Sequence, residues 1–211
     1  GLGKNFMNPA LAGRMLCATL PILMTTWAEP LHWVSLVNPD AVSAATPLSS
    51  LHDGALPTQT LPQLFLGQQG GCMGEVSSAM LLLGFVYLLL RRVISARIPL
   101  AYLGTVVLIS LLFYPTGINP LVWTAYQLLS GGLIMGAIFF ATDPTTSPVT
   151  PRGQVIFGVG CGLLTMLLRY HGSYPEGVGW AILTMNCLVW LMDRMGMPRR
   201  FGIGRFTVTK N

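Results

Sequence analysis

Six long apolar segments constrain this chain more than any other feature of its sequence. They occupy residues 9–27, 74–90, 98–114, 121–142, 155–168 and 177–192. Most approach the roughly 20 residues that an α-helix needs to cross the hydrocarbon core of a bilayer. The first segment is the weakest, because Arg14 and Pro21 interrupt it, and a tilted or partly broken helix suits it best. The pattern predicts an all-α integral membrane protein, a polytopic bundle with about six transmembrane helices.

The charged residues are too few for a water-soluble surface. Asp, Glu, Lys and Arg make up 9% of the 211 residues, whereas soluble domains carry about 25%. The net charge of +5 would suit nucleic acid in a soluble protein. Here the basic residues lie at the ends of apolar segments, where membrane topology and anionic headgroups favour them. The sequence therefore indicates a lipid bilayer as partner and argues against nucleic acid.

The cations also predict an orientation. With six membrane-spanning helices, ten basic residues fall on one side of the membrane: Lys4, Arg91, Arg92, Arg97, Arg152, Arg194, Arg199, Arg200, Arg205 and Lys210. Only Arg169 falls towards the other side. Basic loops stay in the cytoplasm, so we expect a single membrane domain (1–211) with an outer loop (28–73) and a cytoplasmic tail (193–211).

The outer loop is the one long polar interval. Residues 29–69 have no strong apolar period and are punctuated by five prolines: Pro30, Pro39, Pro47, Pro57 and Pro62. The interval is predicted to lack regular structure. A loop of this length within a compact protein is usually functional or disordered.

Glycine-rich patches lie at membrane depth or at its edge. They comprise residues 1–3, residues 70–74 and the set Gly131, Gly132 and Gly136. One interpretation is close helix packing through small residues. The other is a discontinuous helix that lines a site, or backbone brought near a planar ligand.

A few polar residues are candidates for an ion path. Glu75 opens an apolar segment, where the helix dipole favours a carboxylate. Asp143, within the polar loop 141–153, either belongs to a capped connection or coordinates a cation with neighbouring hydroxyls. Arg14 stands within an apolar segment, where a cation normally pairs or faces a cavity; we expect its side chain to extend inward, to the cytoplasmic side, towards Lys4. His171 is expected to be a solvated residue rather than a proton relay.

No residue set for hydrolytic or group-transfer chemistry is recognisable. The cysteines (Cys17, Cys72, Cys161 and Cys187) lack the spacing of zinc or iron–sulfur ligands. Neither a hydrolase triad nor a nucleotide-binding loop is present. Any redox chemistry would therefore need a cofactor.

Several motifs in order along the chain carry a family resemblance. Residues 40–46, with the pattern Asp-x-x-Ser-small-Ala-Thr, resemble the flavinylation motif of the RnfD/NqrB family of redox-driven ion pumps. Residues 1–10, 70–77, 129–144, 151–153 and 174–177 resemble further motifs of that family. The resemblance covers residues 1–202 and is closer to RnfD, because Pro47 and Leu48 follow Thr46. Whole family members have about ten membrane-spanning helices, so the resemblance implies that an N-terminal portion is missing.

The resemblance implies a cofactor and its attachment site. Thr46 would carry FMN through a phosphoester bond, and Asp40, Ser43 and Ala45 would complete the attachment motif. A flavin transferase would make the bond on the outer side. By analogy with the NqrB branch of the family, the chain could also bind a second, non-covalent flavin, but no residue in the sequence identifies its site.

The resemblance also implies a function and partners. The chain would be a multi-pass subunit of an Rnf-type complex in a bacterial or archaeal cytoplasmic (inner) membrane. The complex would pass electrons between ferredoxin and NAD, coupled to Na⁺ or H⁺ translocation. Partner subunits would carry iron–sulfur centres, the NADH site and a second covalent flavin. Two alternatives remain open: a cofactor-free channel or secondary transporter, and a membrane scaffold.

Overall fold

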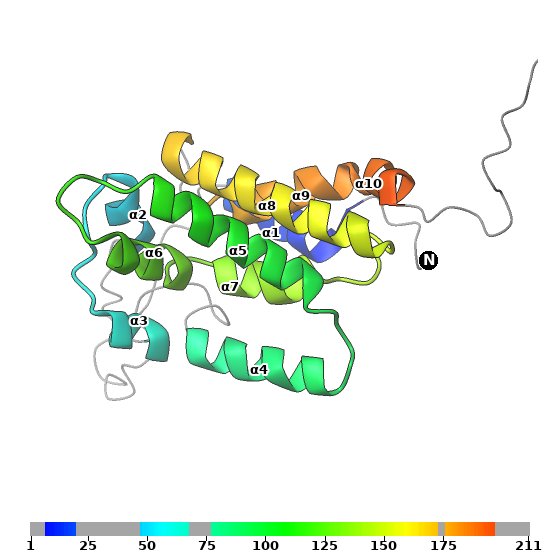
Figure 1. Ribbon diagram of the computed structural model, residues 1–211, viewed down its shortest axis with the longest axis horizontal. Coiled ribbons are helices and arrows are strands. Elements are labelled where there is room, and N and C mark those ends of the chain that lie inside the picture. The colour runs from blue at the N-terminus through cyan, green and yellow to red at the C-terminus, as the bar shows by residue number, and fades with distance from the viewer. Residues whose placement is uncertain (1–6, 20–46, 68–76, 173–175, 197–211) are drawn as a thin grey trace, which may run out of the picture.

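The computed structural model describes residues 7–19, 47–67, 77–172 and 176–196, and within these ranges every regular element is helical. The predicted all-α class is thus confirmed for this part of the chain (Figure 1). The helices are α1 (Pro9–Thr19), α2 (Pro47–His52), α3 (Leu61–Leu66), α4 (Ser78–Leu90), α5 (Arg97–Leu112), α6 (Pro120–Leu129), α7 (Leu133–Met135), the π-helix η1 (Gly136–Phe140), α8 (Pro151–His171), α9 (Val178–Cys187) and α10 (Val189–Gly196).

Helices α5 and α8 form the centre of the bundle and lie side by side (Figure 1). Two glycines one turn apart on α8 allow the close approach. A Cβ atom on Gly158 would lie 2.7 Å from the carbonyl oxygen of Ile98, and one on Gly162 would lie 2.7 Å from Thr105 Cβ. The hydroxyls of Tyr102 and Thr165 share a buried hydrogen bond of 2.5 Å across the same contact. Small residues that bring backbones together are typical of helix pairs in membranes.

Each predicted apolar segment overlaps one to three of these helices, but six spanning helices are not confirmed. Among the described residues, only α8 is by itself long and apolar enough to cross a bilayer. The pair of α6 with the continuous segment Leu133–Phe140 meets the same requirement together, although it is bent by 67°. Helices α4, α5 and α9 are apolar but shorter, at 10–17 residues.

Two predicted segments are interrupted rather than continuous. Segment 121–142 breaks between α6 and α7, and segment 177–192 divides at Leu188 into α9 and α10. At the second break, the amide of Leu188 donates to Met185 O and the amide of Leu191 donates to Leu188 O, both at 3.0 Å. These short-range turn bonds replace the regular i→i−4 ladder, so the helix does not run through.

The prediction of an irregular outer loop is wrong for residues 47–52 and 61–66, which are helical, and holds for residues 53–60 between them. Helices α2 and α3 fold onto α6, and Leu48, Leu51 and Leu64 are buried with Trp123 and Tyr126 in a core cluster of their own. The apolar residues of this segment recur three apart, which is a helical spacing, but the prolines between them concealed it. The remainder of the predicted loop, residues 28–46 and 68–73, lies outside the described residues.

The start of the predicted tail is likewise structured. Asp193 lies in α10, and its carboxylate accepts hydrogen bonds from the amides of Val149 and Thr150, both at 3.0 Å. These bonds fix α10 to the loop before α8. Residues 197–211 lie outside the described part of the chain.

Candidate functional site

The predicted flavin attachment site borders the described part of the chain. Thr46, Asp40, Ser43 and Ala45 lie outside the described residues, as does Glu75. Helix α2 begins at Pro47, the residue directly after Thr46, and both Pro47 and Leu48 are buried. The surroundings of α2 are therefore the part of this site that the structure describes.

The break between α6 and α7 lies next to α2. Helix α6 ends at Leu129, and Ser130 turns to an extended conformation. Gly131 then has φ +68°, in the left-handed region that favours glycine, and α7 begins at Leu133. The glycine patch of the sequence thus forms a discontinuous helix, while Gly136 also packs closely, since a Cβ there would lie 2.3 Å from Val178 Cγ1. Close packing is confirmed for Gly136 and the helix break for Gly131, while a site lined by this break stays a prediction.

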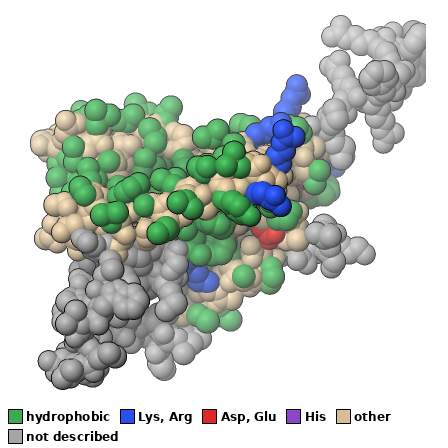
Figure 2. Space-filling model, turned by 90° about the horizontal axis from the view of Figure 1, so that it is seen from below, with side chains coloured by type: hydrophobic (Ala, Val, Ile, Leu, Met, Phe, Trp, Pro, Cys, Tyr) green, Lys and Arg blue, Asp and Glu red, His purple; other side chains and the backbone are tan. Residues whose placement is uncertain are grey.

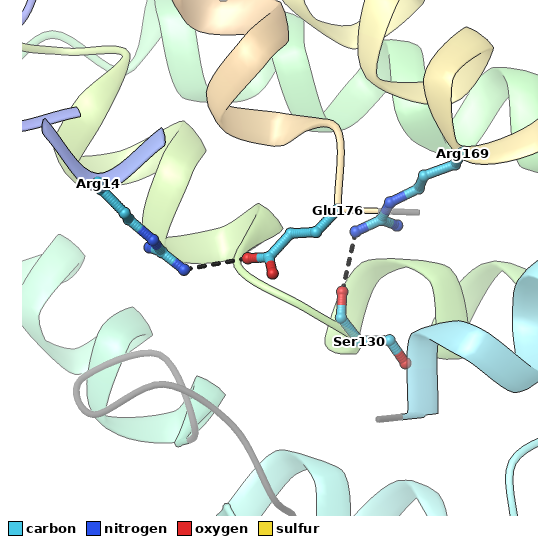
Figure 3. A network of polar contacts seen from close by, with 4 residues as sticks. All are labelled: Arg14, Ser130, Arg169 and Glu176. Carbon is cyan, nitrogen blue, oxygen red and sulfur yellow. Dashed lines mark hydrogen bonds and ion pairs between the residues drawn. The ribbon is translucent and has the colours of Figure 1, made fainter. Parts of the chain in front are cut away.

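Arg169 binds the free carbonyl groups at the end of α6. Its Nη1 donates to the backbone oxygen and the side-chain oxygen of Gln127, at 2.6 and 3.0 Å, and its Nη2 donates to the backbone oxygen of Ser130 at 2.9 Å (Figure 3). The side chain is 2% exposed. A helix carries partial negative charge at its C-terminal carbonyls, so a cation there is stabilised. Arg169 was predicted to lie towards the outer side, but its burial against the break was not predicted.

Helix α2 covers the break and contacts the same arginine. A Cβ atom on Gly131 would lie 3.1 Å from Leu48 Cδ2, so Leu48 occupies the space that the glycine leaves. The Nδ1 atom of His52 lies 2.7 Å from the backbone oxygen of Arg169. Two contacts therefore join α2, the end of α6 and α8 at one place: Leu48 with Gly131, and His52 with Arg169.

The prediction for Arg14 is wrong, because Arg14 pairs with a carboxylate that is distant in the chain. Arg14 Nη2 forms an ion pair with Glu176 Oε1 at 3.0 Å, instead of extending towards Lys4, which lies outside the described residues (Figure 3). A small recess adjoins the pair and is lined in part by Gly132 and Gly179. Glu176 belongs to the turn motif 174–177 and directly precedes an apolar segment. Its position in the sequence could have indicated a partner for Arg14.

Asp143 is the one predicted ion-path residue that the structure describes. Its Oδ2 accepts hydrogen bonds from Asn8 Nδ2 (3.2 Å), Thr145 Oγ1 (2.8 Å) and Thr146 Oγ1 (3.2 Å). Its Oδ1 accepts from the amide of Thr145 at 3.2 Å. A cation would have to displace some of these donors, so the geometry favours the capped connection. Ion coordination by Asp143 stays a prediction.

Three buried polar atoms lack a hydrogen-bond partner in the part of the chain that the structure describes. They are Ser130 Oγ, Arg169 Nε and Asn186 Nδ2. Two of them belong to the helix break, where the Ser130 hydroxyl points away from Arg169 and towards α2 (Figure 3). No group of three or more His, Cys, Asp or Glu side chains that could hold a metal ion occurs within the described ranges.

The sequence matches one family model and many curated proteins. The model of the NQR2, RnfD, RnfE family matches residues 1–202. Among the relatives are a subunit of the Na⁺-translocating ferredoxin:NAD⁺ oxidoreductase complex of Acetobacterium woodii, 44% identical over 96% of this chain, and a subunit of the proton-translocating ferredoxin:NAD⁺ oxidoreductase complex of Clostridium ljungdahlii, 40% identical over 97%. A subunit of an ion-translocating oxidoreductase complex of Stutzerimonas stutzeri is 38% identical over 96% of the chain.

The alignments cover a smaller share of the relatives than of this chain. The alignments cover 61%, 64% and 65% of these three proteins, so the chain spans less than two thirds of their length. The family model, by contrast, covers nearly all of the chain, and the identities exceed one third over that whole length. The chain belongs to the NQR2, RnfD, RnfE family.

Proposed function

We propose that the chain is the membrane subunit of an Rnf-type complex that carries FMN covalently on Thr46. The complex would pass electrons between ferredoxin and NAD and couple this transfer to Na⁺ or H⁺ translocation. The observation that carries the proposal is the attachment pattern at residues 40–46, in a chain whose relatives are named as subunits of ferredoxin:NAD⁺ oxidoreductase complexes.

The position of α2 supports this role for Thr46. Consecutive Cα atoms lie about 3.8 Å apart, and the residue after Thr46 is buried against the bundle. A group on Thr46 would therefore be attached close to the helical core. A bound FMN would supply one- and two-electron transfer. The chain itself would hold the flavin, and the phosphoester would prevent its loss to the outer side.

The proposed surroundings follow from the family and the charges. We propose a bacterial or archaeal cytoplasmic membrane, with Thr46 outward and the C-terminus in the cytoplasm. The partners would be other membrane and peripheral subunits, with iron–sulfur centres, an NADH site and a second covalent flavin, together with a flavin transferase. Glu75 and Asp143 stay the proposed ion-path residues, and a second, non-covalent flavin stays open.

Covalent flavin is directly testable. The chain is expressed in a host with a flavin transferase, denatured and separated on a gel, and flavin fluorescence is read from the band. We expect a bright wild-type band, a dark Thr46→Val band and a bright Thr58→Val band, since Thr58 is an exposed threonine outside the motif. Mass spectrometry of the peptide that contains Thr46 would locate the FMN. A bright Thr46→Val band, or a wild-type peptide without adduct, would refute the attachment.

The helix break favours one alternative function. Discontinuous helices line substrate and ion sites in secondary transporters, and the 67° bend after α6 is such a feature. A cofactor-free transporter predicts colourless protein and solute flux in liposomes without an electron donor. A flavin-loaded chain without such flux would exclude it.

A further inference from the structure

Helix α2 depends on its neighbours for its position. It has six residues, and a helix of that length is not stable in isolation. Its apolar side chains Leu48 and Leu51 are 4% and 2% exposed, and they pack with Trp123 of α6. Within the described ranges, contacts with α6, the break and α8 hold α2 on the bundle.

Arg169 contacts both sides of this junction with different atoms. Its guanidinium group holds the end of α6 through Gln127 and Ser130. Its backbone oxygen is free for His52 because it belongs to the last turn of α8, where carbonyls have no partner within the helix. One residue therefore connects the break in the α6–α7 helix to α2.

A second contact makes this connection sensitive to the backbone of the break. Leu48 fits against Gly131, whose positive φ exists only while the helix is broken. Straightening the break would move Gly131 and remove the surface on which Leu48 rests. The conformation of the break and the position of α2 therefore stabilise each other.

We propose that Arg169 is a positioning residue for the flavin anchor: with His52 and the Leu48–Gly131 contact it fixes α2, the helix that begins directly after Thr46, to the helix break. This inference rests on the proposed attachment of FMN to Thr46. It adds that the flavin environment and the conformation of the break are coupled. By linkage, a change in one changes the other by the same free energy.

The test compares His52→Ala with His171→Ala in flavin-loaded protein. His171 is an exposed histidine two residues from Arg169 and serves as the matched control. Loss of the His52 hydrogen bond should raise amide exchange of the α2 peptide about fivefold. Collisional quenching of the flavin fluorescence by iodide should also increase, because a less firmly held anchor exposes the ring. His171→Ala should match wild type in both measurements.

A second pair tests the guanidinium directly. Arg169→Met removes all donors to Gln127 and Ser130, whereas Arg169→Lys keeps the charge and one donor group. We expect faster α2 exchange and stronger quenching in Arg169→Met, with partial rescue in Arg169→Lys. If Arg169→Met fails to fold, His52→Ala still decides, because it leaves the guanidinium contacts intact.

The outcomes separate this inference from the proposed function. Wild-type chain without covalent flavin overturns both. Flavin-loaded wild type, with His52→Ala indistinguishable from His171→Ala in exchange and quenching, overturns the positioning role alone. Faster α2 exchange with unchanged quenching shows that α2 is docked there but does not position the flavin, and this also overturns the proposal.

Discussion

At the scale of single residues, a cation within an apolar segment (Arg14) and one at the end of another (Arg169) are stabilised in different ways. Arg169 is 2% exposed, and its described partners are neutral oxygens at the end of a helix. Arg14 is paired with the carboxylate of Glu176, and both side chains are about one fifth exposed. The deeper cation thus uses several carbonyl dipoles that are already ordered, which avoids the burial of a second full charge. The shallower cation is instead paired with a carboxylate.

Substitutions of two neighbouring residues at the helix break should change the free energy of unfolding by very different amounts. Gly131→Ala places a methyl group at φ +68° and 3.1 Å from Leu48, so we expect a loss of about 1–2 kcal/mol in the free energy of unfolding. Ser130→Ala removes a hydroxyl that has no described partner, so we expect a change near zero. Denaturant or thermal unfolding in detergent measures both. Equal effects would contradict this account of the break.

The Arg14–Glu176 pair should show a modest coupling energy. Because both side chains are partly exposed, we expect about 0.5–1 kcal/mol from a double-mutant cycle with Arg14→Met and Glu176→Gln. The double variant should be less destabilised than the sum of the single variants. A coupling energy near zero in unfolding measurements would mean that the pair contributes nothing to stability.

At the scale of helices, the sequence predicted where helices lie better than where they break. The length of the apolar segments located α4, α5 and α8. Hydropathy is read from neighbouring residues alone, and bilayer thickness fixes how long a spanning segment must be. The bend after α6 depends on Arg169, 39 residues from Ser130 in the chain, and no local pattern reveals that bond. Helices α2 and α3 were missed for the opposite reason: the prolines that indicate a loop also start helices, as Pro47 and Pro62 do here. A long-range partner thus accounts for the difference at the break, and the two meanings of proline account for the missed helices.

The contact between α5 and α8 should be sensitive to side-chain volume. Gly158→Val and Gly162→Val each introduce atoms where a Cβ alone would lie 2.7 Å from α5, so we expect a loss of about 1–3 kcal/mol or failure to accumulate. Gly104→Ala is the matched control, because nothing lies within 4 Å of a Cβ there, and alanine should stabilise the helix by up to about 1 kcal/mol. Expression level and thermal unfolding of the three variants report the difference. Equal stability in all three would contradict close packing at this contact.

At the scale of the molecule, the charges separate from the apolar surface. Figure 2 shows basic side chains mainly towards one end, with hydrophobic side chains spread over much of the remaining described surface on this face. The predicted cytoplasmic loops meet at one place, where Arg97 Nη1 and Ser95 Oγ both donate to Gln154 Oε1, at 3.5 and 3.2 Å. Leu83, Leu90 and many other apolar side chains of the helices are largely exposed, which suits a hydrocarbon surrounding. The sequence could predict this arrangement because the charge of a loop does not depend on distant contacts.

This separation of charge leads to a prediction of sidedness that can be tested without the flavin. In a background with all four cysteines replaced, single cysteines are placed at two exposed positions, Thr58→Cys and Arg91→Cys, on opposite sides of α4 in the chain. A membrane-impermeant maleimide applied to spheroplasts should label Thr58→Cys and spare Arg91→Cys, because basic loops stay in the cytoplasm. Permeabilised cells serve as the control and should label both. The reverse pattern would place the attachment motif in the cytoplasm. Labelling of both in intact spheroplasts would mean that α4 does not cross the membrane; in that case its exposed leucines would have to be covered by a partner subunit rather than by lipid.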